Sequence, residues 1–304
     1  MREDAKWHLP APVRLGLGMA AFGSATPISK IVVSAMPVFV GSTLRVGLGA
    51  LVLTPVAIRH RAAIAGMSGR DWGLVALISL FGMFGFSALM LYGMSMTSGV
   101  VGATIMSTTP AVTAAASMLL VGDRPTWRKL VAIVLAVVGV MTLHLGTNQI
   151  PGSNLDLALG SALIFAAVCC EACYTLLGKR MSEDMDPGLV AFLAALLSLP
   201  LFIPFAIWQW SQVDWQGMDA TVWTAVIWYG AGTLALGTYL WYSGLRDAEG
   251  AVAAGFMGVM PASALILSYL LLGEAFAWLH LAGFSIVFAG VLLMSWEHAA
   301  MADE

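Results

Sequence analysis

Residues 93–140 read GMSMTSGVVGATIMSTTPAVTAAASMLLVGDRPTWRKLVAIVLAVVGV, and residues 244–291 read GLRDAEGAVAAGFMGVMPASALILSYLLLGEAFAWLHLAGFSIVFAGV. One constant offset aligns the two stretches without a gap. The matched positions are Pro110 with Pro261, Gly122-Asp123 with Gly273-Glu274, Trp127 with Trp278, and Gly139-Val140 with Gly290-Val291. Self-similarity of this kind indicates a duplicated unit. We therefore expect one repeat over residues 1–147 and a second over residues 148–304.

The composition around these stretches indicates a membrane protein. Of 304 residues, 60% are hydrophobic and only 10% are charged, whereas soluble domains carry roughly 25% charged residues. This excludes secreted, disordered and cytosolic classes. Continuous apolar runs, each near the ~20 residues that a spanning helix needs, occur at 13–34, 37–57, 72–94, 99–121, 127–145, 155–178, 187–208, 220–242, 250–272 and 276–296. The sequence predicts an all-α polytopic membrane protein with ten transmembrane helices.

The basic residues predict the orientation of these spans. With ten spans, twelve of the 14 Lys and Arg residues fall on the side that holds both chain ends, and the other two, Lys30 and Arg45, lie within spans. Cytoplasmic loops carry the excess of Lys and Arg in membrane proteins. We therefore expect both termini in the cytoplasm.

Five spans in each repeat predict an inverted arrangement. Because five is an odd number, the second repeat must enter the bilayer from the opposite face. Inverted repeats are typical of secondary transporters, whose substrate site lies near the bilayer midplane between the halves. The pattern therefore predicts a central cavity and transport by alternating access.

Several stretches also resemble a known family. In the first copy they are Tyr92 to Ala103, Pro110, Gly122 to Pro125 and Gly139-Val140. In the second copy they are Tyr242 to Ala254, Pro261 and Leu272 to Glu274. Near the start of the chain they are Phe22 to Ser24, Lys30 and Leu44-Arg45. Together they resemble the EamA-type half of the drug/metabolite transporter superfamily. The resemblance implies ten helices around a cavity lined by spans 1, 3, 4, 6, 8 and 9, and export of amino acids or related amphiphilic metabolites across the bacterial inner membrane. Within the family, the length and loop pattern look similar to a bacterial exporter of aromatic amino acids.

Glu171 lies inside the sixth predicted span, where relatives usually carry an apolar or aromatic residue. An ionised carboxylate in the bilayer costs roughly 2.5 kcal/mol or more. Glu171 should therefore face water, pair with a cation or stay protonated. It is a candidate for substrate binding or energy coupling, and the structural alternative is an ion pair or a position at the edge of the cavity.

Lys30 and Arg45 are further candidates for gating or coupling. Both lie in the outer halves of their predicted spans. Either side chain could receive a substrate carboxylate, and either could instead extend along the lipid to the interface.

The remaining candidates for the cavity wall are aromatic, methionine and proline residues. Tyrosine offers an apolar face with a polar tip, methionine adapts to ligands of varied shape, and a proline within a span frees a backbone carbonyl. These candidates are Met83, Tyr92, Pro110, Tyr174, Tyr239, Met257 and Pro261. Each has an ordinary structural alternative: interface anchoring for tyrosine, bundle packing for methionine and a simple kink for proline.

Enzyme motifs are missing from the sequence. It contains no G-x-x-x-x-G-K-[ST], H-E-x-x-H or G-x-S-x-G pattern, so we expect no catalytic residues, no cofactor and no metal site. The net charge of −3 does not favour nucleic acid. The expected partners are a small-molecule substrate and the lipid bilayer, with no obligate protein partner. The alternatives are an exporter of a drug, nucleobase or sugar conjugate, and an intramembrane enzyme or lipid-handling protein.

Overall fold

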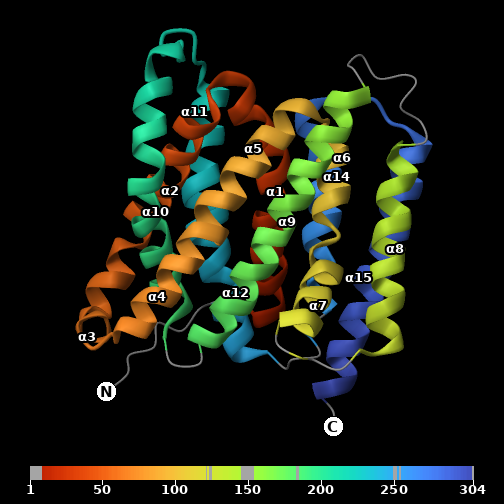
Figure 1. The fold of residues 1–304 in the computed structure, drawn as a ribbon, viewed down its shortest axis with the longest axis horizontal. Coiled ribbons are helices and arrows are strands. Elements are labelled where there is room, and N and C mark those ends of the chain that lie inside the picture. Colours follow the sequence, from red (N-terminus) through yellow and green to blue (C-terminus); the bar gives the residue numbers. More distant parts are fainter. Residues whose placement is uncertain are drawn as a thin grey trace.

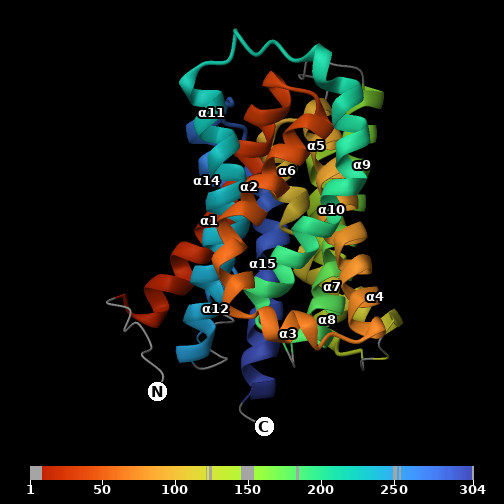
Figure 2. The same ribbon diagram turned by 90° about the vertical axis from the view of Figure 1, so that its left-hand side faces the viewer.

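The computed structural model describes residues 9–120, 122, 125–144, 154–182, 185–248, 252 and 255–302. Every regular element in these ranges is a helix, as the sequence predicts. The helices form one bundle, and α1 begins at the same end of the bundle at which α15 finishes (Figures 1 and 2).

The structure describes nine helical elements in the first part of the bundle. They are α1 (Ala11–Ala35), α2 (Val38–Arg59), α3 (Arg61–Ala65), α4 (Gly69–Ile78), η1 (Ser79–Gly85), α5 (Phe86–Met96), α6 (Gly99–Met106), α7 (Thr109–Leu120) and α8 (Trp127–His144). Side-chain caps set some of the starts. Ser68 and Asp71 form a capping box at α4, and Ser98 accepts a hydrogen bond from the Val101 N–H at α6, because the first N–H groups of a helix lack partners inside it.

The second part of the described chain also consists of helices. Its elements are α9 (Asn154–Ser182), α10 (Pro187–Gln209), η3 (Trp210–Gln212), α11 (Ala220–Ile227), η4 (Trp228–Leu236), α12 (Gly237–Asp247), α14 (Val259–Leu272) and α15 (Trp278–Ala302). The Asp186 carboxylate accepts hydrogen bonds from the Gly188 and Leu189 N–H groups at the start of α10, and the Asp219 carboxylate accepts one from the Val222 N–H in the first turn of α11.

Seven helical segments in the described ranges are long and apolar enough to cross a bilayer. They are Ala11–Ala35, Val38–Arg59, Gly69–Met96, Gly99–Leu120, Leu155–Gly178, Pro187–Gln212 and Trp278–Trp296. Each lies within a few residues of one of the expected apolar runs. Of the other three expected runs, two coincide with α8 and with the first residues of the continuous α11–η4–α12. The third, 250–272, is matched only over its later part by α14, a shorter apolar helix, and some of its first residues lie outside the described ranges.

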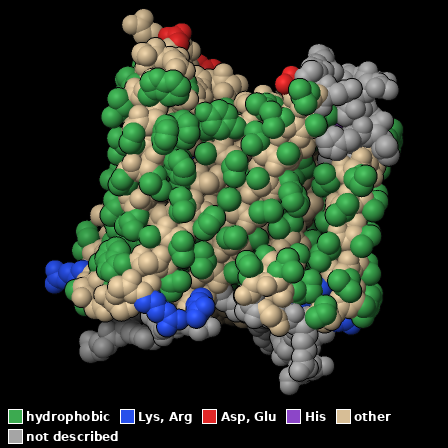
Figure 3. Space-filling view, viewed as in Figure 1, with side chains coloured by type: hydrophobic (Ala, Val, Ile, Leu, Met, Phe, Trp, Pro, Cys, Tyr) green, Lys and Arg blue, Asp and Glu red, His purple; other side chains and the backbone are tan. Residues whose placement is uncertain are grey.

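The surface separates charge from apolar area as a membrane protein requires. On the face drawn in Figure 3, hydrophobic side chains cover the middle of the molecule, Lys and Arg appear along the lower edge, and Asp and Glu appear along the upper edge. Arg59, Arg61 and Arg70 are exposed where α2 ends and α3 and α4 begin, whereas Asp214 and Asp219 are exposed at the opposite end. The apolar belt is the surface that lipid would cover.

Small residues bring helices from the two parts into close contact. A methyl group at Gly93 of α5 would lie 2.8 Å from the Gly160 carbonyl oxygen of α9, and one at Gly139 of α8 would lie 2.7 Å from the Gly283 oxygen of α15. Glycine allows backbones to approach in this way within membranes. Gly290, the repeat partner of Gly139, lies in the same α8–α15 interface, against Ala132.

Four helix irregularities occur in two matched pairs. Residues 107–108 form a turn between α6 and α7, immediately before Pro110, and residues 257–258 form a turn before α14 and Pro261. The π-helical segments η1 and η4 interrupt the long helices Gly69–Met96 and Ala220–Asp247. The two prolines indicate the first pair, but the π-helical segments were not predicted. Single π-helical turns inside α-helices are frequent at functional sites.

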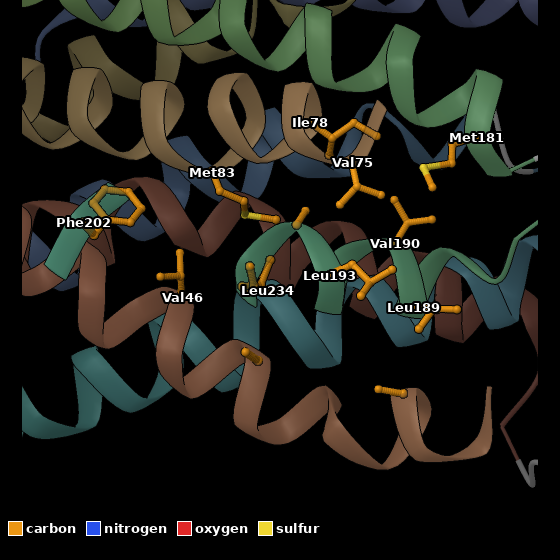
Figure 4. Packing of buried hydrophobic residues seen from close by; sticks show 14 residues of the cluster. Val46, Val75, Ile78, Met83, Met181, Leu189, Val190, Leu193, Phe202 and Leu234 are labelled. Atoms are coloured by element: carbon orange, nitrogen blue, oxygen red, sulfur yellow. The ribbon is translucent and has the colours of Figure 1, made fainter. Parts of the chain in front are cut away.

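One large apolar cluster surrounds η1. Figure 4 shows Met83 of η1 among Val46 of α2, Phe202 and Leu193 of α10 and Leu234 of η4. Met83 is 2% exposed. It therefore belongs to the packed core that joins these elements.

Candidate functional site

Arg45 is a buried cation at the meeting point of three elements. Its side chain extends from α2, and the residue is only 7% exposed. Nη1 donates a hydrogen bond to Ser87 Oγ of α5 at 2.6 Å. The guanidinium carbon lies 4.6 Å from the ring centre of Tyr229 in η4 and 5.6 Å from that of Phe86. Arg45 therefore does not extend to the lipid interface, and cation–π contacts fix the plane of its guanidinium.

The charge of Arg45 has no direct counterion in the described ranges. No Asp or Glu there lies within 4.0 Å of it, although Glu171 interacts with it electrostatically over a longer distance. Its Nε is fully buried and has no hydrogen-bond partner among the described residues. Burying a charged donor without a partner is costly, so this arginine is an unusual feature of the bundle.

Glu171 lies on α9 and is partly buried. Its Oε2 lies 3.0 Å from Thr109 Oγ1, a hydroxyl whose single proton is shared between this carboxylate and the Met106 carbonyl oxygen at 2.7 Å. Thr109 is the first residue of α7, so the break before Pro110 places this hydroxyl beside the carboxylate. Within the described part of the chain, no other donor to the carboxylate is present, and most of its acceptor capacity is free.

Tyr174 follows Glu171 by one helical turn and lies against η1. A Cβ atom at Gly82 would overlap the Tyr174 ring, and one at Gly85 would lie 3.2 Å from Cys170 Sγ. The π-helical segment η1 therefore touches α9 through its glycines. The charged groups Arg45 and Glu171 both act electrostatically on the Tyr174 hydroxyl.

These contacts bring together charged, hydroxyl and aromatic groups from both parts of the chain. We call the following residues the central polar cluster: Arg45, Ser87, Thr109, Glu171, Tyr174 and Tyr229. Arg45 and Glu171 supply opposite charges from different repeats, and tyrosine rings lie beside both. Such an arrangement can bind a molecule that carries charge and an apolar group together.

Lys30 lies in a different place, at the connection between α5 and α6. Its Nζ donates to the carbonyl oxygens of Met94 and Thr97, each at 2.6 Å. Glu274, which follows α14, accepts hydrogen bonds from the N–H groups of Gly99 and Val100 at the start of α6. A cation at a helix C-terminus and an anion at a helix N-terminus are both stabilising. Lys30 and Glu274 also interact with each other electrostatically, and we call them the α5–α6 charge pair.

The other predicted cavity residues lie in varied environments. Tyr92 is half-buried in an apolar cluster that includes Tyr229, and its ring meets Phe39 edge-on at 5.9 Å between ring centres. Tyr239 is 44% exposed and Met257 is 36% exposed. Pro261 is buried where α14 packs against α1. Of the residues predicted as site candidates, the structure brings together Arg45, Glu171 and Tyr174, with Met83 and Pro110 on adjoining segments.

Sequence reasoning missed Ser87, Thr109, Tyr229 and the capping role of Glu274. Each of these depends on a contact between helices that lie far apart in the sequence. The glycine pairs Gly82/Gly85 and Gly230/Gly232, at similar places in the two repeats, are the signal that points to the π-helical segments.

The described residues contain no group of three or more His, Cys, Asp or Glu side chains placed to hold a metal ion. Cys169, Cys170 and Cys173 are free thiols on α9.

Comparisons with known proteins identify the family. The model of the EamA-like transporter family matches residues 15–145 and again residues 158–296. The uncharacterized transporter YetK of Bacillus subtilis (strain 168) is 32% identical over 289 residues, which cover 95% of this chain and 87% of YetK. The uncharacterized transporter YyaM of the same organism is 25% identical over 95% of this chain and 94% of its own length.

A more distant relative is also named a transporter, and a solved structure has a similar fold. An uncharacterized transporter of Archaeoglobus fulgidus is 24% identical over 80% of this chain and 89% of its own length. A crystal structure of another protein superposes with a TM-score of 0.65 and 15% identity, covering 96% of this chain and 98% of the other, and this likeness concerns the fold alone. The apolar helices, the duplicated pattern and the two family matches together mean that this multi-pass membrane protein belongs to the EamA-like transporter family.

Proposed function

We propose that this chain is a secondary transporter that exports aromatic or neutral amino acids and related amphiphilic metabolites by alternating access. The proposal includes ten transmembrane helices in two inverted repeats, residues 1–147 and 148–304, around a central substrate site. It also places both termini in the cytoplasm of a bacterium, with the protein in the inner membrane.

The central polar cluster is the observation that carries the choice of substrate. An amino acid has a carboxylate, an ammonium group and a side chain. Arg45 offers a cation for the first, Glu171 offers an acceptor for the second, and the rings of Tyr174 and Tyr229 offer apolar surface for the third. Charged groups within a membrane bundle are expensive, and they typically mark substrate or ion pathways.

The course of the chain supports the inverted arrangement. α1 begins at the end of the bundle where α15 finishes, whereas α9 begins at the opposite end (Figure 1). The matched helix breaks before Pro110 and Pro261 and the paired segments η1 and η4 are further features that a duplicated unit explains. Broken helices at corresponding places are typical of transporter binding sites.

The charge distribution supports the orientation. Arg59, Arg61 and Arg70 are exposed at the end of the bundle where α15 finishes. Because positive charge is retained on the cytoplasmic side, this end is assigned to the cytoplasm.

Two kinds of energy coupling fit the site. Glu171 either carries a proton in one direction while substrate moves in the other, or it binds the ammonium group of the substrate and transport is passive. Its single hydrogen bond within the described ranges, from Thr109, leaves acceptor capacity for either role.

Purified protein in liposomes loaded with labelled L-phenylalanine or L-threonine tests the proposal. We expect efflux that exceeds the leak from protein-free liposomes. Unlabelled amino acid should compete with the label and reduce this efflux. If Glu171 carries the proton, the wild-type protein should accumulate substrate when a pH gradient is imposed and Glu171→Gln should abolish this accumulation. If Glu171 binds the ammonium group and transport is passive, the wild-type protein itself should show no such accumulation. No protein-dependent efflux of any amino acid would refute the substrate assignment.

Export of an organic cation is the second candidate, because Glu171 and the neighbouring tyrosine rings also suit a drug-like amine. Competition separates the two: hydrophobic cations without a carboxylate should inhibit amino acid efflux poorly under the first proposal and strongly under the second.

A further inference from the structure

We infer that Arg45, Ser87 and Tyr229 form a carboxylate-binding subsite, so that a carboxylate group is the chemical feature that every good substrate must carry. The inference deepens the proposed function, and its transport part rests on that function. Its binding part is independent and can be tested without any movement of substrate.

The first step is the missing counterion. The chain also contains a buried guanidinium at Arg14, which is 4% exposed. Arg14 has a counterion, since it pairs with the Asp247 carboxylate and donates to the Ser243 carbonyl oxygen at 2.8 Å, although its Nε, like that of Arg45, has no partner among the residues described. Arg45 is buried to a similar degree, yet Ser87 is its one hydrogen-bond partner among the residues described. A bound anion would supply at Arg45 what Asp247 supplies at Arg14.

The second step is the geometry of the free donors. A guanidinium is planar and carries five N–H donors in that plane. Tyr229 and Phe86 lie 4.6 and 5.6 Å from its central carbon, and Ser87 accepts from Nη1. Nε has no partner within the described ranges. Two parallel N–H···O bonds to one carboxylate are the strongest and most selective way to use such donors.

The third step concerns Glu171. It interacts with Arg45 electrostatically but lies beyond the 4.0 Å of a direct ion pair. Neither group is therefore occupied by a direct ion pair with the other, and each is available for the opposite end of a zwitterion. The side chain of such a substrate then meets the tyrosine rings of the central polar cluster.

Four compounds with the same phenyl ring test the inference. They are L-phenylalanine, 3-phenylpropionate, L-phenylalaninamide and 2-phenylethylamine, and the readout is the rise in the thermal unfolding midpoint of the purified full-length protein. The first two carry a carboxylate, and we expect them to stabilise the wild-type protein at concentrations about tenfold or more below those that the last two require.

Substitutions in the subsite test whether it causes this preference for compounds with a carboxylate. Arg45→Gln should abolish the preference, and Arg45→Lys should keep a weaker one, because lysine retains the charge but not the planar pair of donors. Ser87→Ala removes the residue that orients Nη1 and should weaken carboxylate binding severalfold. Arg246→Gln is the control, since Arg246 is 64% exposed and pairs with Asp186; its preference should match that of the wild type.

The outcomes distinguish this inference from the proposed function. Equal stabilisation by the amine, the amide and the two carboxylates would overturn the subsite, as would an unchanged preference in Arg45→Gln, which would leave Arg45 as a purely structural contact. If Arg45→Gln does not fold, Arg45→Lys and Ser87→Ala decide in the same assay. Carboxylate-selective binding without transport would contradict the proposed function but leave the subsite intact.

Discussion

Gly82 marks the closest approach between η1 and the helix that carries Glu171. A Cβ atom at this position would overlap the ring of Tyr174, whereas a Cβ at Gly73, in α4 of the same continuous helical segment, would meet nothing within 4 Å. Glycine at residue 82 is therefore required by packing, while at residue 73 it is not.

Gly82→Ala should push Tyr174 or η1 out of place and slow transport at least severalfold, with a loss of stability on the order of 1–3 kcal/mol, the usual cost of overpacking. Gly73→Ala should leave transport unchanged and raise stability slightly, because alanine is favoured over glycine in helices by about 1 kcal/mol. Efflux rates and unfolding midpoints of the two variants check this. Equal transport by both would show that the contact between η1 and α9 has no role in the site.

For single residues, the sequence indicated the charged side chains of the site but not the residues that contact them. Glu171 and Arg45 are conspicuous because charges are rare in apolar spans. Ser87 and Thr109 are ordinary small residues, and only the folded arrangement of α2, α5, α7 and α9 brings their hydroxyls to the charges. Lys30 was predicted as a gating candidate on the same grounds, and its observed contacts are two carbonyl oxygens at the end of α5.

At the level of secondary-structure elements, charged side chains hold the connection between α5 and α6. Lys30 from α1 binds the carbonyls that end α5, and Glu274 from the second part of the chain binds the N–H groups that begin α6. The α5–α6 charge pair thus joins α1, the α5–α6 connection and the segment after α14 at one end of the bundle. Its loss should loosen that end alone.

Glu274→Gln removes the charge and one of the two acceptor oxygens, and hydrogen bonds to charged groups contribute roughly 1.5–3 kcal/mol. We expect a lower unfolding midpoint and faster maleimide labelling of a cysteine at Thr97, a residue only 5% exposed, in a background where the three native cysteines are alanine. Asp71→Asn is the matched control, since it weakens the cap of α4. Faster labelling in the control, or unchanged labelling in Glu274→Gln, would show that the pair does not hold this end closed.

Helix positions were predictable from the sequence, and helix irregularities were only partly so. Apolar runs placed α1, α2 and α10 within a few residues, because the length of an apolar span is set by the bilayer. The breaks before Pro110 and Pro261 follow from the missing proline N–H. The π-helical segments η1 and η4 were not predicted. Glycines mark both places in the sequence, but the extra residue in each turn is accommodated by neighbouring helices that pack against Gly82 and Gly230, and these neighbours are known only from the fold.

For the whole molecule, composition was the strongest guide. A chain with 60% hydrophobic and 10% charged residues must place most of its surface in lipid, and the apolar belt in Figure 3 has that form. The duplicated pattern agrees with the two family matches over residues 15–145 and 158–296. The choice of substrate does not follow from composition, because it depends on how Arg45 and Glu171 from the two repeats come to lie near each other.

Solute counterflow tests the central claim most directly, because only a carrier whose site opens alternately to the two sides can exchange one molecule for another. Liposomes containing the protein and preloaded with unlabelled L-phenylalanine are diluted into a trace of labelled L-phenylalanine. The account predicts transient accumulation of label above the outside concentration for the wild-type protein, and its loss in Arg45→Gln. Absence of counterflow with every amino acid tried, or the same counterflow in Arg45→Gln as in the wild type, would contradict it.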